Sequence, residues 1–185
     1  MTGGTLLALV FALGWIPLFV YRAEGLTEAL PTYRGAERFW VCATPVLLAL
    51  HVSLACLTLN ATGNVSRWGA AAGLTVFATA LALWFSGRVR IGPLRRRRLP
   101  DEPPLRLRRD GAFAVVRHPL YASYLLACAA PVLVLRRGYL VATYGVCVIA
   151  VATRAIQEER RLRAQLGAEY DAYCRDVKRL VPFVW

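Results

Sequence analysis

The sequence predicts an all-α integral membrane protein with about five transmembrane helices and a polar C-terminal part on one side of the membrane. Hydrophobic residues make up 57% of the 185-residue chain, a share too high for an ordinary soluble domain. The charged residues are concentrated in a few connections between long apolar runs. The 23 basic residues outnumber the 11 acidic ones. These three observations together favour a multi-pass membrane protein.

Three runs without charge come close to or exceed the roughly 20 residues that cross a bilayer; they are residues 1–21, 39–66 and 68–87. Two shorter runs, 119–135 and 138–153, flank a pair of arginines, so we expect a helical hairpin that barely crosses or tilts. The first basic residue, Arg22, follows the first run, which favours a retained helix over a signal peptide. We therefore expect a three-helix region over 1–87 and a C-terminal region over 88–185, in one integrated domain.

The basic residues predict the orientation of the helices. Five alternating spans would leave 20 of the 23 basic residues on one side, which the positive-inside rule makes the cytoplasm. The N-terminus is then outside and the C-terminus cytoplasmic. This topology, with attraction to anionic lipid, explains the net charge of +12 better than nucleic-acid binding does. The five cysteines have no spacing typical of a disulfide framework or a zinc site.

Two features of the first region favour helix packing over chemistry. His51 is the single ionisable residue of the second run, and we expect a neutral side chain hydrogen-bonded to a neighbouring helix rather than a cavity residue. The small residues from Gly69 to Gly73 predict close helix contact, either within the protomer or between protomers.

The C-terminal region begins with a proline-rich connection over residues 88–117, which we expect to be a loop with a basic block at Arg95–Arg98. The segment Leu105–Gly111 favours a short extended piece and a turn. From Arg154 onward, apolar residues at helical spacing predict an amphipathic helix on the membrane surface or over a pocket. Residues 182–185 include aromatic side chains suited to the membrane interface.

Two pairs of polar residues are the candidates for chemistry. Arg154 and Glu158 share a helix face, either as a surface ion pair or as a cation and a carboxylate in one cavity. Glu159 points elsewhere on that helix, and we expect it to be solvated. His118 and Tyr121 also face together at the start of a helix. They could bind a carboxylate or an adenine edge, or simply form part of an aromatic belt.

Several of these motifs, in order, carry a family resemblance. They are Gly111–Phe113, Val116–Tyr121, Arg154, Glu158–Glu159, Leu162, Leu166–Gly167, Tyr170, Tyr173 and Val181–Phe183. This pattern resembles the C-terminal signature of the isoprenylcysteine carboxyl methyltransferase and phospholipid methyltransferase superfamily, over about residues 105–185. The first three helices add a span count compatible with the five-span prokaryotic members.

The resemblance implies an S-adenosylmethionine-dependent methyltransferase whose catalytic region is 88–185, with the cofactor pocket on the cytoplasmic side. It implies cofactor contacts from the residues Phe113, His118, Pro119, Leu120 and Tyr121, with Leu107 and Arg108 as weaker candidates. Glu158 matches a cofactor-binding acid, and Arg154 matches a position that holds the carboxylate of the substrate. The implied partners are a lipophilic or small methyl acceptor and membrane lipids. One departure from the pattern is Ser123, where many relatives have glycine.

Two other functions are compatible with parts of the sequence. Membrane sterol reductases have a similar C-terminal architecture and use NADPH, whose phosphates would suit an arginine-rich loop. A non-enzymatic lipid-binding protein would need the apolar helices and basic loop, but not the four residues His118, Tyr121, Arg154 and Glu158 together. The sequence leaves open the identity of the methyl acceptor and the oligomeric state.

Overall fold

The computed structural model describes residues 2–29, 33–91 and 107–185, and these ranges are all-α, as predicted. The described helices are α1 (Gly3–Ala29), α2 (Gly35–Thr62), α3 (Arg67–Ile91), α4 (Ala112–Val115), α5 (Pro119–Leu135), α6 (Gly138–Leu166) and α7 (Ala168–Asp176). Within these ranges the one β-type contact is an isolated parallel bridge between Val116 and Lys178.

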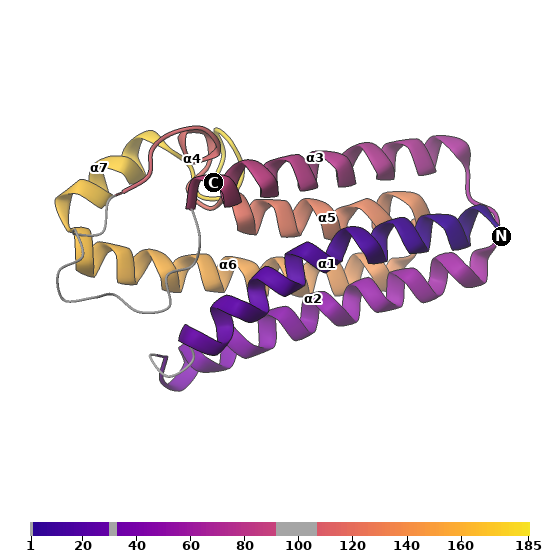
Figure 1. The fold of residues 1–185 in the computed structure, drawn as a ribbon, viewed down its shortest axis with the longest axis horizontal. Coiled ribbons are helices and arrows are strands. Elements are labelled where there is room, and N and C mark those ends of the chain that lie inside the picture. Colours follow the sequence, from indigo (N-terminus) through magenta and orange to yellow (C-terminus); the bar gives the residue numbers. More distant parts are fainter. Residues whose placement is uncertain (1, 30–32, 92–106) are drawn as a thin grey trace.

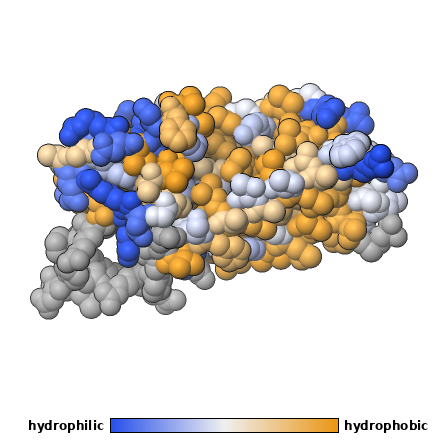
Figure 2. Space-filling model, turned by 90° about the horizontal axis from the view of Figure 1, so that it is seen from above, coloured by the Kyte–Doolittle hydropathy of each residue, from blue (hydrophilic) through white to orange (hydrophobic). Residues whose placement is uncertain are grey.

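Four of the described helices, α1, α2, α3 and α6, are long and apolar enough to cross a membrane. The apolar α5 has 17 residues and is therefore about 25 Å long, slightly less than a hydrocarbon core of about 30 Å. The five helices run side by side along the molecule (Figure 1). Apolar surface fills the middle of the face in Figure 2, and hydrophilic residues gather toward its two ends. A multi-pass membrane protein fits these features.

The core of the bundle lies around α5, which packs along α3 and also contacts α2 and α6. Small side chains make this approach possible, since Ala127, Cys128 and Ala130 of α5 are fully buried. His51 of α2 completes the contact between helices. Its Nδ1 lies 2.8 Å from the Thr143 hydroxyl of α6, and its Nε2 lies 3.0 Å from the Cys128 carbonyl oxygen. The expected hydrogen-bonded histidine is thus confirmed.

The small residues of α3 face α5 of the same protomer. A Cβ added at Gly73 would lie 3.1 Å from the Ala130 carbonyl oxygen and would overlap the Val134 side chain. Gly69 also lies against Val134, with ordinary contact distances. The predicted close approach therefore serves packing within the protomer, where small residues let two backbones come together.

The structure corrects the expected helix boundaries after residue 153. We expected a separate amphipathic helix from Arg154 onward, but α6 continues without a break from the apolar run to Leu166. No helix-breaking residue occurs before Gly167, which has φ +54°, a conformation that glycine adopts at little cost. The chain turns there into α7. The end of α6, α7, α4 and the C-terminus lie together at one end of the molecule (Figure 1).

The connection before α4 is described only in part. The predicted turn at Asp110 and Gly111 is present, with Phe113 N donating to the Asp110 carbonyl at 3.1 Å and Gly111 at φ +56°. Residues 107–109 belong to no helix or strand, so the expected extended piece stays a prediction. Arg95–Arg98 lie outside the described residues.

Candidate functional site

The start of α5 is held by the last residues of the chain, 177–185, which we call the strap. Val116 is extended and pairs with Lys178. Arg117 N donates to the Lys178 carbonyl at 2.7 Å, and His118 N donates to the Arg179 carbonyl at 3.1 Å. Pro119 then begins the helix, at a position where the missing N–H costs nothing. The strap thus fixes the backbone from which the His118 side chain projects.

A buried carboxylate, Glu159 of α6, joins these elements. It is fully buried and accepts a hydrogen bond from Arg117 Nε at 2.9 Å. Arg179 of the strap donates to both of its oxygens, at 2.9 and 2.8 Å. This contact raises the pKa of Arg179 above its ordinary value. A buried charge needs such partners, so Glu159 locks the strap, the start of α5 and α6 to one another.

The expectation that Glu159 is solvated is therefore wrong. The neighbouring Glu158 side chain is 43% exposed, whereas Glu159 has no exposed surface. Successive residues of a helix point about 100° apart, and the helix is turned so that Glu159 faces the bundle. Of these two carboxylates, the available one is that of Glu158.

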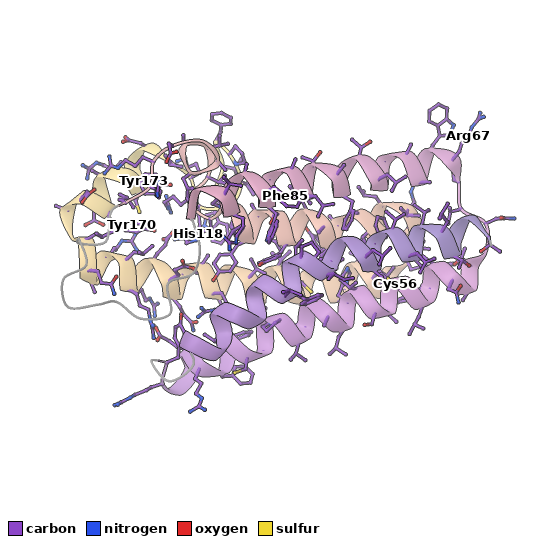
Figure 3. All side chains as sticks on the ribbon, in the orientation of Figure 1. Cys56, Arg67, Phe85, His118, Tyr170 and Tyr173 are labelled. Carbon is purple, nitrogen blue, oxygen red and sulfur yellow. The ribbon has the colours of Figure 1, made fainter. Side chains whose placement is uncertain are left out.

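His118 lies between the two carboxylates. Its Nδ1 is 4.0 Å from a Glu158 oxygen, and its Nε2 is 3.3 Å from a Glu159 oxygen. Its ring centroid is 5.5 Å from that of Tyr121, so the expected facing of these two side chains is confirmed. Both side chains are buried. Figure 3 places His118 at the same end as Tyr170 and Tyr173, far from Arg67.

Arg154 is the buried cation of this end of α6. It is 3% exposed, and its Nη1 donates to Gln157 Oε1 at 2.8 Å. None of the ion pairs among the described residues includes it, and its buried Nε has no hydrogen-bond partner there. The possible ion pair with Glu158 is therefore not formed in this part of the chain. Gln157 was not predicted as a site residue, although its spacing of three from Arg154 was a usable signal.

Tyr33 also contacts this part of α6, and the sequence did not predict it as a site residue. Its ring lies 5.3 Å from the Arg154 guanidinium and 3.9 Å from that of Arg161. Arg161 also bonds to Glu37 near the start of α2. Tyr33 and the start of α2 therefore pack against the side of α6 that carries Arg154. No spacing in the sequence could indicate this contact, because it joins positions more than 100 residues apart.

The remaining predicted contact residues divide into two groups. Phe113 and Leu107 are half-buried and Arg108 is exposed. The Phe113 carbonyl accepts a hydrogen bond from the Tyr173 hydroxyl at 2.6 Å. Burial raises the pKa of Tyr173 to about 12, so this hydroxyl keeps its proton to a higher pH than an ordinary tyrosine. The α4 segment is thus tied to α7.

Pro119 and Leu120 have structural contacts in addition to their predicted role. Both side chains lie near Gly87 of α3, where an added Cβ would be 3.3 Å from each. Ser123 is fully buried, and its hydroxyl donates to the Leu120 carbonyl at 2.7 Å. The Ser123 hydroxyl is therefore satisfied within α5. Cofactor contact by Pro119 and Leu120 stays a prediction.

A small apolar hollow lies beside Tyr121. It is lined by residues of α1, α2 and α5, among them Trp15, Leu18, Leu48 and Tyr124. Trp15 stacks on Tyr124 with ring centroids 6.2 Å apart. Tyr121 both lines this hollow and faces His118, so the hollow is adjacent to the His118–Tyr121 pair.

Comparison of the chain with protein-family models, curated proteins and solved structures finds no match. Among the described residues no group of histidine, cysteine and acidic side chains could hold a metal ion. The candidate site consists of the half-exposed Glu158, the buried Arg154 and His118, and the apolar hollow beside Tyr121.

Proposed function

We propose that the protein is an integral-membrane S-adenosylmethionine-dependent methyltransferase that acts on a lipophilic or small acceptor. The observation that carries the proposal is the state of Arg154, a buried guanidinium without a carboxylate partner among the described residues. It lies one helical turn before the half-exposed Glu158. Because buried charges are normally paired, Arg154 is suited to bind an anionic group. The half-exposed carboxylate of Glu158 is suited to a cationic group.

The residues fit the proposed cofactor in charge and position. Glu158 is half-exposed, and its contact with His118 is long, at 4.0 Å, so its carboxylate is available to an ammonium or sulfonium group. His118 and Tyr121 offer a ring nitrogen and a hydroxyl beside it. When bound, S-adenosylmethionine supplies an electrophilic methyl group. The protein's own task is then to hold the acceptor in line and to exclude water, and good orientation can supply about 7–11 kcal/mol.

The surroundings of Tyr121 and Arg154 support an acceptor with an apolar part and an anionic group. The hollow beside Tyr121 is lined by aromatic and aliphatic side chains, and Arg154 would bind a carboxylate. A carboxylate or thiolate acceptor needs no general base. An amine acceptor would need one, and His118 or Glu158 would be the nearest group to remove the proton.

Ligand titration tests the proposal. The purified protein in lipid nanodiscs is titrated with S-adenosylhomocysteine and with NADPH by calorimetry. We expect S-adenosylhomocysteine to bind, and Glu158→Gln to abolish this binding while the variant stays folded. Binding of NADPH alone would instead support a reductase. Binding of neither ligand would favour a non-enzymatic lipid-binding protein.

A second experiment identifies the acceptor. Membranes that contain the protein are incubated with methyl-labelled S-adenosylmethionine and a host lipid extract, and the labelled product is identified by mass spectrometry. Arg154→Leu should keep S-adenosylhomocysteine affinity and lose transfer to an acceptor that carries a carboxylate. Equal loss of both properties would contradict the separate roles of Arg154 and Glu158.

A further inference from the structure

Residues 181–185, the tip of the strap, form an exposed apolar segment at the end of the molecule that holds α4, α7 and the C-terminus (Figure 1), which we call the basic end. Val181, Phe183, Val184 and Trp185 are all exposed, and Phe183 is 93% exposed. Exposed apolar clusters of this kind mark surfaces that meet a partner or a membrane. None of these side chains takes part in the candidate site described above.

The backbone of the tip is arranged to present Phe183 outward. Phe183 has φ +64°, a left-handed conformation that is rare and strained for a residue other than glycine. The turn is closed because Leu180 N and Val181 N both donate to the Trp185 carbonyl at 2.8 Å. In water, nothing offsets the strain of a backbone conformation that exposes an aromatic ring. If the ring enters an apolar phase, its transfer from water offsets the strain.

The depth of the tip relative to the membrane follows from α3. Trp68 and Val89, near its two ends, are both strongly exposed and lie 21 residues apart, so they are separated by about 32 Å along the helix. This length matches a hydrocarbon core of about 30 Å. Pro119 lies against Gly87, near the same end of α3 as Val89, and Val116 pairs with Lys178. The strap therefore lies at the level of this end of α3.

The charge around the tip also fits a lipid surface. Arg175 and Lys178 are exposed on the segment that leads into it and outnumber its one exposed acid, Asp176. Basic residues near a bilayer attract anionic headgroups. Exposed aromatic and aliphatic side chains next to basic ones are typical of segments that lie in the interface. Apolar surface at the boundary depth and a basic rim therefore point to the same occupant, the bilayer interface.

We infer that residues 181–185 insert into the bilayer interface at the basic end of the bundle, and that this insertion keeps the strap seated on α5. A series of direct contacts links the tip to the start of α5. The Trp185 ring lies 4.6 Å from the Arg179 guanidinium, Arg179 bonds to Glu159 at 2.8 Å, and the strap backbone accepts the N–H groups of Arg117 and His118. Lipid contact at the tip thus stabilises the backbone that positions His118.

Insertion is tested by quenching of Trp185 fluorescence. The protein is placed in nanodiscs of phosphatidylcholine and phosphatidylglycerol whose acyl chains are brominated close to the headgroup. The contribution of Trp185 is the difference between the wild type and Trp185→Phe. We expect this contribution to be quenched by the brominated lipid and shielded from aqueous iodide. Quenching by iodide alone, or shielding from both quenchers in a contact between two copies, would overturn the inference.

Seating of the strap is tested by limited trypsin digestion followed by mass spectrometry, since Lys178 and Arg179 are cleavage sites within it. Phe183→Ser should raise the cleavage rate at these sites several-fold in nanodiscs. Phe183→Gly should do the same, although it relieves the positive φ. Greater protection in Phe183→Gly would mean that the ring serves only the local turn and would overturn the inference.

Phe39→Ser is the matched control, because Phe39 is also a strongly exposed phenylalanine but lies on α2 and has no contact with the strap. We expect its cleavage rate at Lys178 and Arg179 to equal that of the wild type. Faster cleavage in this control would assign the effect to general loosening of the bundle. Neither readout requires a cofactor, so the inference stands or fails independently of methyltransferase activity.

Discussion

At the scale of single residues, replacement of the adjacent carboxylates Glu158 and Glu159 by glutamine is predicted to change the free energy of unfolding by very different amounts. Glu159→Gln removes the buried negative charge that pairs with Arg117 and Arg179. Breaking a buried ion pair on one side typically costs about 3–5 kcal/mol. We expect a loss of this size in the free energy of unfolding, measured by denaturant titration in detergent micelles.

Glu158→Gln is the matched control at the neighbouring position. Its side chain is 43% exposed, so the free energy of unfolding should change by less than about 0.5 kcal/mol. The same variant should lose S-adenosylhomocysteine binding. Equal destabilisation by the two substitutions would contradict the division between a structural and a binding carboxylate.

Because of Tyr173, the stability of the basic end should fall as the pH rises in the alkaline range. Burial raises its pKa to about 12, whereas a tyrosine in the unfolded chain has a pKa near 10. The folded state therefore keeps the proton more tightly, and the contribution is complete below pH 10 and is lost as the pH rises through 12. The loss should reach about 2–3 kcal/mol. Tyr173→Phe should show a shallower decline in unfolding free energy over the same range, and identical slopes would disprove the assignment.

The candidate site shows which residue properties a sequence can predict. The facing of His118 and Tyr121 follows from local helical spacing, and the structure confirms it. The roles of Glu158 and Glu159 could not be separated in this way, because periodicity gives their relative angle but not the direction of the bundle. That direction depends on Arg117 and Arg179, which lie 42 and 20 positions from Glu159.

At the scale of secondary structure elements, the contact between α3 and α5 depends on a missing side chain. A Cβ at Gly73 would overlap Val134 and approach the Ala130 carbonyl. Gly73→Ala should therefore lower the free energy of unfolding by about 1–3 kcal/mol, as overpacking does in tight interfaces. Gly145→Ala in α6 is the control, since nothing lies within 4 Å of its added Cβ. It should be neutral or slightly stabilising, and an equal loss in both variants would argue against a special contact at Gly73.

The elements were predictable where a local signal marks their ends. The predicted limits of 119–135 are those of α5, because Pro119 suits the first turn and Arg136 leaves the helix in a left-handed conformation. The break between α6 and α7 was misplaced, although Gly167 marks it. The change from apolar to amphipathic pattern at Arg154 reflects a change of surroundings, and the backbone continues through it.

At the scale of the whole molecule, the apolar runs predicted the bundle because each must bury its backbone polar groups within a helix. The docking of the strap on α5 could not be predicted in the same way. Its backbone bonds, from Arg117 and His118 to Lys178 and Arg179, depend on two irregular segments about 60 residues apart. Such contacts leave no periodic pattern in either segment. The site therefore takes its residue types from local motifs and its geometry from long-range contacts.

The orientation of the bundle is the last prediction, and labelling of introduced cysteines tests it. Ser66→Cys lies between α2 and α3, and Ala168→Cys follows α6; both positions are exposed. With the N-terminus outside and α5 crossing the membrane, an impermeant maleimide added to intact cells should label Ser66→Cys and leave Ala168→Cys unlabelled until the cells are opened. The wild type corrects for the native cysteines. Labelling of Ala168→Cys alone would show that the orientation is the reverse of the predicted one. Labelling of both positions from outside would mean that α5 does not cross, because α6 would then end on the outer side.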